Sequence, residues 1–270
     1  EPRLDYAVQI KGPVCTPVLH TIKAMWTRSH LGKDWREELW PWMQDKHRLR
    51  RLRGLWQQAR MKLTPDEQAP FIKAASDPHP VRCAFVMRDN LRQRRTIERA
   101  AIQAIQRARH EIDIVTPYFY PARQLRLALK QAAARGVRVR LLLQGKVDIP
   151  IAGLAARVLY VGLLRSGIDI YEYQPAFLHA KVMRVDQDWA TVGSSNLDPL
   201  SLVLNMEANV IVRDKVFVRH LMHALEQDFA HSVAIPKEQH QPTRWGKLGH
   251  WLFSLGAKLY LRLAGNTGRY

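Results

Sequence analysis

The stretch that decides the fold is His179-Ala-Lys-Val-Met-Arg-Val-Asp186, followed by Trp189-Ala-Thr-Val-Gly193-Ser-Ser-Asn196. The segments Val182–Val185 and Trp189–Val192 are short apolar runs of the kind that form β-strands. Between them, Asp186-Gln187-Asp188 has the composition of a turn. The pattern therefore predicts two strands joined as a hairpin.

Period-two alternation along such a hairpin places His179 and Lys181 on one face of the sheet. Ser194 and Asn196 leave the second strand and can converge on the same point. A histidine can attack or protonate a phosphoryl group, a lysine supplies fixed positive charge, and a hydroxyl and an amide donate hydrogen bonds to phosphoryl oxygens. These four residues therefore predict a phosphate-binding site.

The spacing His-x-Lys-x4-Asp-x6-Gly-Ser-x-Asn resembles the HKD motif of the phospholipase D superfamily. Glu207 lies 28 residues after His179, where the family carries a carboxylate that hydrogen-bonds its histidine. The resemblance thus implies catalytic roles for His179, Lys181 and Glu207, and phosphate contacts from Ser194 and Asn196. It implies a structural, turn-stabilising role for Asp186.

From Val81 onward, strand-like and helix-like segments alternate along the chain. We expect strands at 82–87, 112–116, 137–143 and 168–173, and helices at 94–109, 123–135, 154–165 and 216–230. This alternation predicts an α/β sandwich with a mixed central sheet flanked by helices. The resemblance to the phospholipase D superfamily covers residues 81 to about 231.

The opening of the chain resembles a later part of it. The segment Asp5–Gly12 aligns with Glu207–Asp214, and each offers a carboxylate, an alternating strand and a following helix. His179 is the one histidine with a lysine two residues later, whereas the superfamily typically has two such motifs. We therefore expect that the first motif is missing, that Asp5 serves its absent histidine, and that this chain holds half of an active site.

These interpretations divide the chain into four parts: the end of a first repeat at 1–30, a Trp/Arg-rich helical insertion at 31–76, a second repeat at 77–235, and a basic amphipathic helix at 236–270. For the segments 35–63 and 243–264, two interpretations remain open. Each is either a helix packed on the protein or an element that lies on a membrane surface. For 153–167 the alternatives are a lid near the substrate and a sheet-covering helix.

Composition limits the partners of the chain. The formal net charge of +18 predicts an anionic partner. Cys15 and Cys83 are too few for a disulfide framework, and no acidic or histidine cluster has metal-ligand spacing, so we expect no metal and no other cofactor. No apolar run is long enough to span a bilayer. We expect a peripheral protein on the cytoplasmic side of a bacterial inner membrane.

Within the superfamily, Thr116-Pro-Tyr-Phe119, Tyr171-Glu-Tyr-Gln-Pro175 and Gly193-Ser-Ser-Asn-Leu-Asp-Pro199 resemble bacterial cardiolipin synthases. This resemblance implies transfer of a phosphatidyl group between phospholipids such as phosphatidylglycerol, through a phosphohistidine. It implies phosphatidylglycerol and cardiolipin as ligands, a membrane surface as partner, and His179 as the general acid and base. No specific nucleic-acid partner is expected.

Two further functional interpretations stay open. One is a phospholipase D-type phosphodiesterase or nuclease whose site is completed by a second subunit, which would account for a single motif per chain. The other is a non-catalytic, membrane-bound remnant. The sequence upstream of Glu1 and the oligomeric state distinguish these interpretations from a half-enzyme.

Overall fold

The structure is a computed structural model that describes residues 2–30, 81–88, 95–146, 159–196 and 207–237. The chain divides into two compact units. One combines Glu1–Ile10 with Val81–Tyr270, and the other is Lys11–Pro80. The first ten residues thus belong to the same unit as the HKD-like motif. The segments 35–63 and 243–264 lie outside the described residues.

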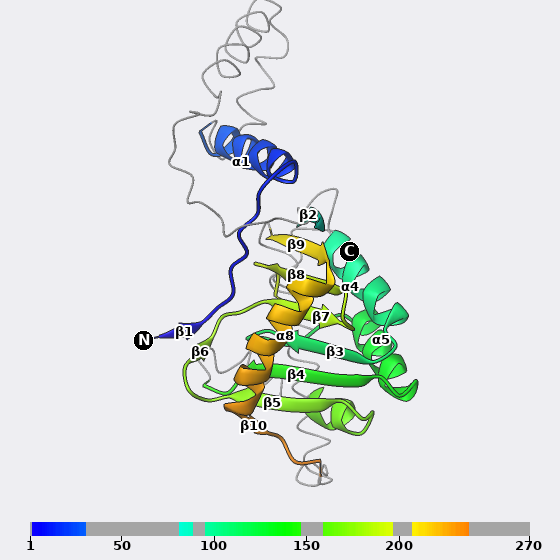
Figure 1. The fold of residues 1–270 in the computed structure, drawn as a ribbon. Helices are drawn as coiled ribbons and strands as arrows, with labels where there is room; N and C mark the ends of the chain where they lie inside the picture. The colour runs from blue at the N-terminus through cyan, green and yellow to red at the C-terminus, as the bar shows by residue number, and fades with distance from the viewer. Residues whose placement is uncertain (1, 31–80, 89–94, 147–158, 197–206, 238–270) are drawn as a thin grey trace, which may run out of the picture. The chain divides into compact units, whose positions relative to one another are not determined.

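The larger unit is built on a mixed eight-stranded sheet (Figure 1). Its strand order is β10-β5-β4-β3-β7-β8-β9-β2. The strands are Arg82–Arg88 (β2), Glu111–Val115 (β3), Arg138–Gln144 (β4), Asp169–Tyr173 (β5), Val182–Val185 (β7), Trp189–Gly193 (β8), Glu207–Arg213 (β9) and Ser232–Ala234 (β10). β3, β4 and β5 are parallel, and the remaining pairs are antiparallel. The predicted α/β fold with a mixed sheet is confirmed.

The predicted hairpin is present as β7 and β8, with Val182 opposite Val192 and Val185 opposite Trp189. Asp186 occupies the turn in a left-handed conformation, with φ of 50°. Its carboxylate accepts hydrogen bonds from the backbone N–H groups of Arg109, His110 and Glu111. These bonds tie the turn to the start of β3, which is a structural contact remote from the motif histidine.

Helices cover both faces of the sheet. Among its described residues, this unit contains the helices α4 (Thr96–Arg107), α5 (Arg123–Ala134) and α8 (Lys215–Ala230), with a further helical segment at 159–164. Figure 1 shows α8 across one face of the sheet and α4 and α5 on the other side. The apolar residues form two buried clusters, one containing residues of α4 and α5 and the other residues of α8. Alternating side chains of β3, β4, β5, β7 and β8 supply both clusters, as expected for a central sheet.

The segment at 159–164 settles one of the alternatives left open by the sequence. Tyr160, Leu163 and Leu164 are all buried in the cluster that contains α4 and α5. The Tyr160 hydroxyl also donates a hydrogen bond to Glu172 on β5. This part is therefore a sheet-covering helix, and the lid interpretation is wrong for it because its apolar side chains face the core.

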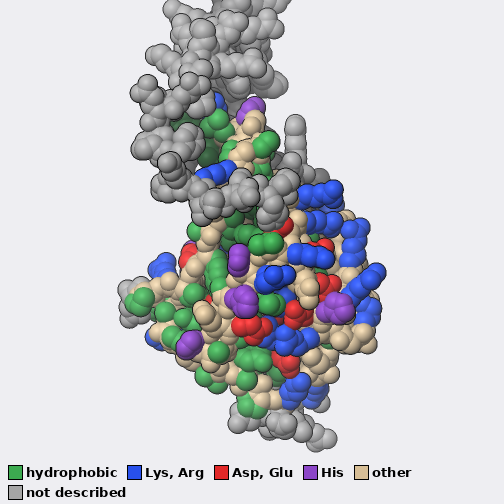
Figure 2. Space-filling view, viewed as in Figure 1, with side chains coloured by type: hydrophobic (Ala, Val, Ile, Leu, Met, Phe, Trp, Pro, Cys, Tyr) green, Lys and Arg blue, Asp and Glu red, His purple; other side chains and the backbone are tan. Residues whose placement is uncertain are grey.

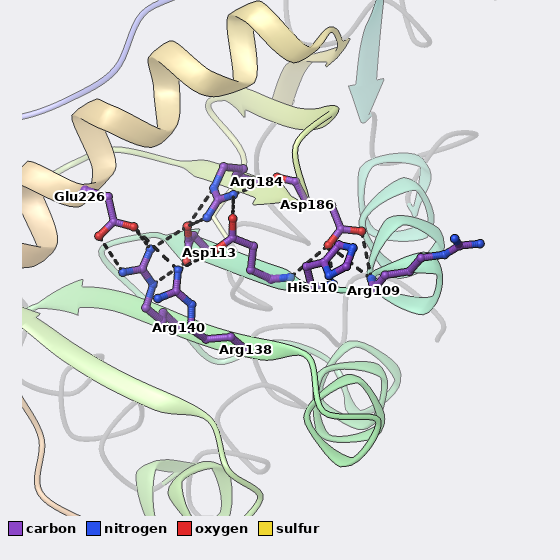
Figure 3. A network of polar contacts seen from close by, with 9 residues as sticks. Arg109, His110, Asp113, Arg138, Arg140, Arg184, Asp186 and Glu226 are labelled. Carbon is purple, nitrogen blue, oxygen red and sulfur yellow. Dashed lines mark hydrogen bonds and ion pairs between the residues drawn. The ribbon is translucent and has the colours of Figure 1, made fainter.

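Beneath α8 lies a network of buried charges (Figure 3). Asp113 on β3 accepts bonds from Arg140 on β4 and from Arg184 on β7, and all three side chains are almost fully buried. Arg140 also bonds Glu226 of α8, and its guanidinium lies 4.1 Å from the centre of the Phe229 ring. The network therefore fastens α8 to three neighbouring strands.

The opening of the chain differs in part from the prediction. Only Arg3–Leu4 forms a strand, β1, which pairs in parallel with β6 (Phe177–Leu178). Residues 5–10 are not part of a strand, although Tyr6 and Val8 still pack against the cluster beneath α8. The ladder ends because β6 itself is only two residues long. The observed strand therefore begins two residues before the predicted start at Asp5, and it is shorter than predicted.

The second unit contains α1 (Cys15–His30), which agrees with the helix predicted to follow the segment Asp5–Gly12. Neither Cys15 nor Cys83, both of which the structure describes, forms a disulfide. Among the described residues, the structure contains no helix with the length and apolar character required to cross a membrane.

Candidate active site

The site lies where three adjacent strands of the sheet begin or end. Lys181 immediately precedes β7, Gly193 ends β8 and Glu207 begins β9. The Gly193 N–H donates to the Lys181 carbonyl at 3.2 Å, and the Ser194 N–H donates to the Ala208 carbonyl at 3.0 Å. Antiparallel pairing of β7, β8 and β9 therefore brings these residues to one edge of the sheet, as the sequence predicted for Lys181 and Ser194.

His179 is held by β1. Its N–H donates to the Leu4 carbonyl at 2.8 Å, and the next N–H, of Ala180, donates to the same oxygen. The imidazole Nδ1 lies 2.7 Å from Asp5 Oδ2, and both side chains are 52% exposed. Desolvation, the largest influence, raises the pKa of Asp5. The hydrogen bond and the charge of His179 act in the opposite direction and help to bring this pKa below its ordinary value.

This pairing corrects two expectations. Glu207 was expected to bond His179, and Asp5 was expected to serve an absent histidine; the structure places Asp5 on His179 instead. The reason is topological. β1 runs beside β6, so the residue after β1 faces the residue after β6, whereas β9 is two strands beyond β7. Sequence spacing from His179 could not reveal which carboxylate lies beside it.

Glu207 is buried and lies beside Ser194. The Ser194 hydroxyl donates to Glu207 Oε2 and accepts a hydrogen bond from the Ala208 N–H at 3.1 Å. Glu207 is also one of the charges that act on Lys181. Glu207 therefore belongs to the same cluster as His179 and Lys181, although it does not orient His179.

Lys181 carries a largely buried ammonium group at the centre of the cluster. Desolvation lowers the pKa of Lys181, the charges of Asp5 and Glu207 raise it, and Arg3 lowers it. Its Nζ donates to the His179 carbonyl at 2.5 Å. A buried cation held in place before the reaction can stabilise an incoming anion at little cost in reorganisation.

Asn209 is a site-forming residue that the sequence did not single out. Its side chain is buried on β9, where Oδ1 accepts from the Ser195 N–H at 3.3 Å and Nδ2 donates to Thr191 at 3.1 Å. A Cβ at Gly193 would lie 2.5 Å from Asn209 Cγ and would collide with the Ala208 carbonyl. Gly193 is therefore required for close approach of β8 and β9. The alternation of β9, which places Glu207 and Asn209 on one face, was the available signal.

The structure thus unites His179, Lys181, Ser194 and Glu207. Asn196 is half-buried two residues beyond Ser194, at the end of the described stretch. Asp186 lies at the far end of β7 and is not part of the cluster. Basic side chains are abundant elsewhere too, since Figure 2 shows Lys and Arg gathered on the side of this unit where α4 and α5 lie.

Comparisons with known proteins show what the chain is similar to. Residues 101–231 match the family model described as "Cardiolipin synthase, PLD-like domain". Cardiolipin synthase B of Salmonella typhi is 45% identical over 156 residues, which are 57% of this chain and 38% of that protein. Cardiolipin synthase B of Escherichia coli K12 is 42% identical over 174 residues, 64% of this chain and 41% of that protein. The chain thus spans about four tenths of the length of these relatives.

A solved structure shows the same fold. The phosphatidylserine synthase of Haemophilus influenzae Rd KW20 aligns with a TM-score of 0.52 and 15% identity, over 77% of this chain and 52% of that one. Residues 101–231 are thus similar to the PLD-like domain of cardiolipin synthases. The solved structure shows the same fold, and in sequence the chain is cardiolipin synthase-like.

Proposed function

We propose that the site is half of the active centre of a phosphatidyltransferase, a cardiolipin synthase that joins phospholipids such as phosphatidylglycerol. The observation that carries the proposal is the cluster of imidazole, ammonium and carboxylate groups at one sheet edge, with Asp5 bonded to His179. The relatives named cardiolipin synthase B support the choice of substrate class.

In this proposal His179 moves protons. Asp5 binds Nδ1 and so leaves Nε2 for the substrate, as the acid of a hydrolase triad does for its histidine. A second histidine attacks phosphorus, a P–N bond forms and the P–O bond breaks. The departing alkoxide takes the Nε2 proton of His179, which enters this step as the imidazolium and leaves it neutral. The incoming hydroxyl then returns a proton to Nε2, its oxygen attacks phosphorus, and the P–N bond breaks.

Lys181, Ser194 and Asn196 would bind the reacting phosphate. Negative charge grows on the phosphoryl oxygens in the transition state, and the buried ammonium of Lys181 is fixed beside His179 before the reaction begins. Loss of one such preorganised donor typically costs roughly 2.7–4 kcal/mol in activation free energy. The Asn196 amide would add a hydrogen bond to the same oxygens, and the exposed Ser194 hydroxyl would add another by turning its hydrogen from Glu207 to the phosphate.

The second histidine must come from outside the described residues, either from a missing N-terminal half or from a second subunit. Asp5 belongs to the segment that aligns with Glu207, yet it bonds His179. By the same reciprocal arrangement, Glu207 would orient the histidine of the other motif. Glu207 is buried, accepts a hydrogen bond from Ser194 and acts electrostatically on Lys181, so it would lie within such a composite site.

We further propose that the protein acts at an anionic membrane surface, peripherally and on the cytoplasmic side of a bacterial inner membrane. The net charge of +18 supports this, since each basic residue near an anionic leaflet contributes about 1 kcal/mol of attraction. The ligands would be phosphatidylglycerol and cardiolipin, and no metal or other cofactor enters the mechanism.

The deciding experiment measures cardiolipin formation from phosphatidylglycerol vesicles by the protein that includes the missing half. His179→Ala is expected to lower turnover by about 10²–10⁴-fold because proton transfer is lost. Lys181→Ala is expected to lower it by about 10²–10³-fold. His223→Ala is the matched control, because His223 is an exposed histidine on α8, away from the cluster. Wild-type turnover in the His179 or Lys181 variant would contradict the proposal.

The chain of residues 1–270 tests the half-site. As a monomer it is expected to bind phosphatidylglycerol vesicles without turnover, since only one motif histidine is present. Activity that rises with dimer concentration would favour a site shared by two subunits, and cleavage of DNA would favour the nuclease. A complete protein that binds vesicles but forms no product would favour the non-catalytic remnant.

A further inference from the structure

Two rows of side chains meet at the candidate site. The first row is Arg3 and Asp5, which are exposed while the intervening Leu4 turns towards the core. The second row is Phe177, His179 and Lys181, which alternate with the buried Leu178 and Ala180. Parallel pairing sets Arg3 beside Phe177 and places Asp5 against His179. Arg3 therefore faces the same side as the candidate catalytic groups.

Arg3 is a cation to which the proposed reaction gives no role. Among the residues that the structure describes, it has no ion-pair partner, and its side chain is exposed. Its charge nonetheless acts on the site. Two influences lower the pKa of Lys181: desolvation is the largest, and the positive charge of Arg3 is a smaller one. An exposed guanidinium that adds repulsion to a buried lysine favours the binding of an anion between or beside the two.

Arg3 is too far along its strand to duplicate His179. It precedes Asp5 by two residues, which is about 7 Å along an extended chain. An anion held by Arg3 would thus be a neighbour of the phosphate at His179 and Lys181. A guanidinium suits such a ligand because its planar donors match phosphate oxygens in pairs.

We propose that Arg3 forms a second phosphate subsite, which binds the phosphodiester of the acceptor phospholipid. This inference rests on the proposed function. In that reaction the two phosphates end on the first and third carbons of one glycerol, so the acceptor's own phosphate must lie a glycerol's length from the reacting phosphorus. Arg3 would hold it there and would favour an anionic lipid over a neutral alcohol as acceptor.

The probes are inorganic phosphate and glycerol 1,3-bisphosphate, titrated calorimetrically into the chain of residues 1–270 at fixed ionic strength. The wild-type chain is expected to bind the bisphosphate about tenfold more tightly than phosphate, the gain of one charge-assisted contact. Arg3→Ala should remove most of this gain and change phosphate affinity less than twofold. Arg3→Lys, which keeps the charge, should retain part of the gain.

Arg107→Ala is the matched control, because Arg107 is an exposed arginine on α4 and its loss changes the net charge equally. Equal behaviour of Arg3→Ala and Arg107→Ala would overturn the second subsite.

Lys181→Met tests the first subsite separately, and it should weaken the binding of both ligands. Unchanged phosphate binding in Lys181→Met would refute the proposed phosphate site, whereas a failure confined to Arg3→Ala would refute only the second subsite. Urea midpoints within error of the wild type establish that the variants are folded.

Discussion

Asp5 Oδ2 lies 2.7 Å from His179 Nδ1, a hydrogen bond between residues 174 positions apart in the chain. An ionised carboxylate can only accept, so a neutral imidazole in this bond carries its hydrogen on Nδ1. The lone pair is then on Nε2, which points away from Asp5. The contact therefore fixes which nitrogen of His179 is available for chemistry.

Asp5→Asn is expected to disturb this tautomer. The neutral amide can donate as well as accept, so the preference for hydrogen on Nδ1 weakens and the Nε2–H form gains population. The measurement is the pair of ¹⁵N chemical shifts of the His179 ring, recorded in the neutral state of the imidazole. The wild type should show the Nδ1–H tautomer and Asp5→Asn a mixture.

Glu207→Gln provides the control for that experiment. Glu207 bonds Ser194 and not His179, so its substitution should leave the His179 tautomer as in the wild type. If Glu207→Gln changed the tautomer and Asp5→Asn did not, the carboxylate expected from sequence spacing would be the correct partner after all.

Gly193→Ala is expected to destabilise the protein by about 1–3 kcal/mol, the usual cost of overpacking. The added Cβ would collide with the Ala208 carbonyl and with Asn209, whose amide holds the Ser195 backbone. Urea unfolding measures the loss. Gly162→Ala is the matched control. A Cβ there meets only Lys130 Nζ at 3.5 Å, within a helical segment, so stability should be unchanged or higher by about 0.5–1 kcal/mol.

Local patterns were sufficient to predict the elements that surround the site. The β7–β8 hairpin follows from apolar runs on either side of a polar turn, and Ile97, Ala101, Ile105 and Ala108 are all buried as helical periodicity required. The position of Lys181 next to Ser194 follows from that hairpin alone. These features depend on residues that are close in sequence, where periodicity carries the information.

The partner of His179 could not be predicted in this way. Its contact with Asp5 depends on β1 pairing with β6, and a two-residue strand leaves no periodic pattern to recognise. From the sequence, Tyr160 and Leu163 could be interpreted either as lid or as core residues. The structure shows that both are buried. Asn209 was missed because a single polar residue in a strand does not reveal that its amide bridges two neighbouring backbones.

Asp113→Asn is expected to cost about 3–5 kcal/mol of stability, the typical penalty for breaking a buried ion pair. The substitution removes the negative charge that Arg140 and Arg184 share, and both guanidinium groups are almost fully buried. The measurement is urea unfolding. Lys237→Ala, which breaks an exposed pair with Asp169, should cost no more than about 1 kcal/mol. Similar losses in both variants would show that the network beneath α8 contributes little.

The last prediction concerns stability in acid. The Arg184 guanidinium, and to a lesser degree Arg138, lowers the pKa of Glu111 to about 2 from an ordinary value of 4.5. Because the folded-state pKa is below the unfolded one, the ionised Glu111 stabilises the protein fully above pH 4.5, and this contribution is lost as the pH falls towards 2. Glu111→Gln, which cannot ionise, should therefore be less stable than the wild type at pH 6, and the difference should shrink steadily between pH 5 and pH 2. Urea unfolding at intervals of one pH unit measures this convergence. Arg138→Ala keeps the Arg184 contact with Glu111. The difference in unfolding free energy between Arg138→Ala and Glu111→Gln should therefore be smaller at pH 6 than the difference between wild type and Glu111→Gln, and it should also shrink as the pH falls. A difference between wild type and Glu111→Gln that stayed constant down to pH 2 would show that the charge of Glu111 is not what the two arginines stabilise.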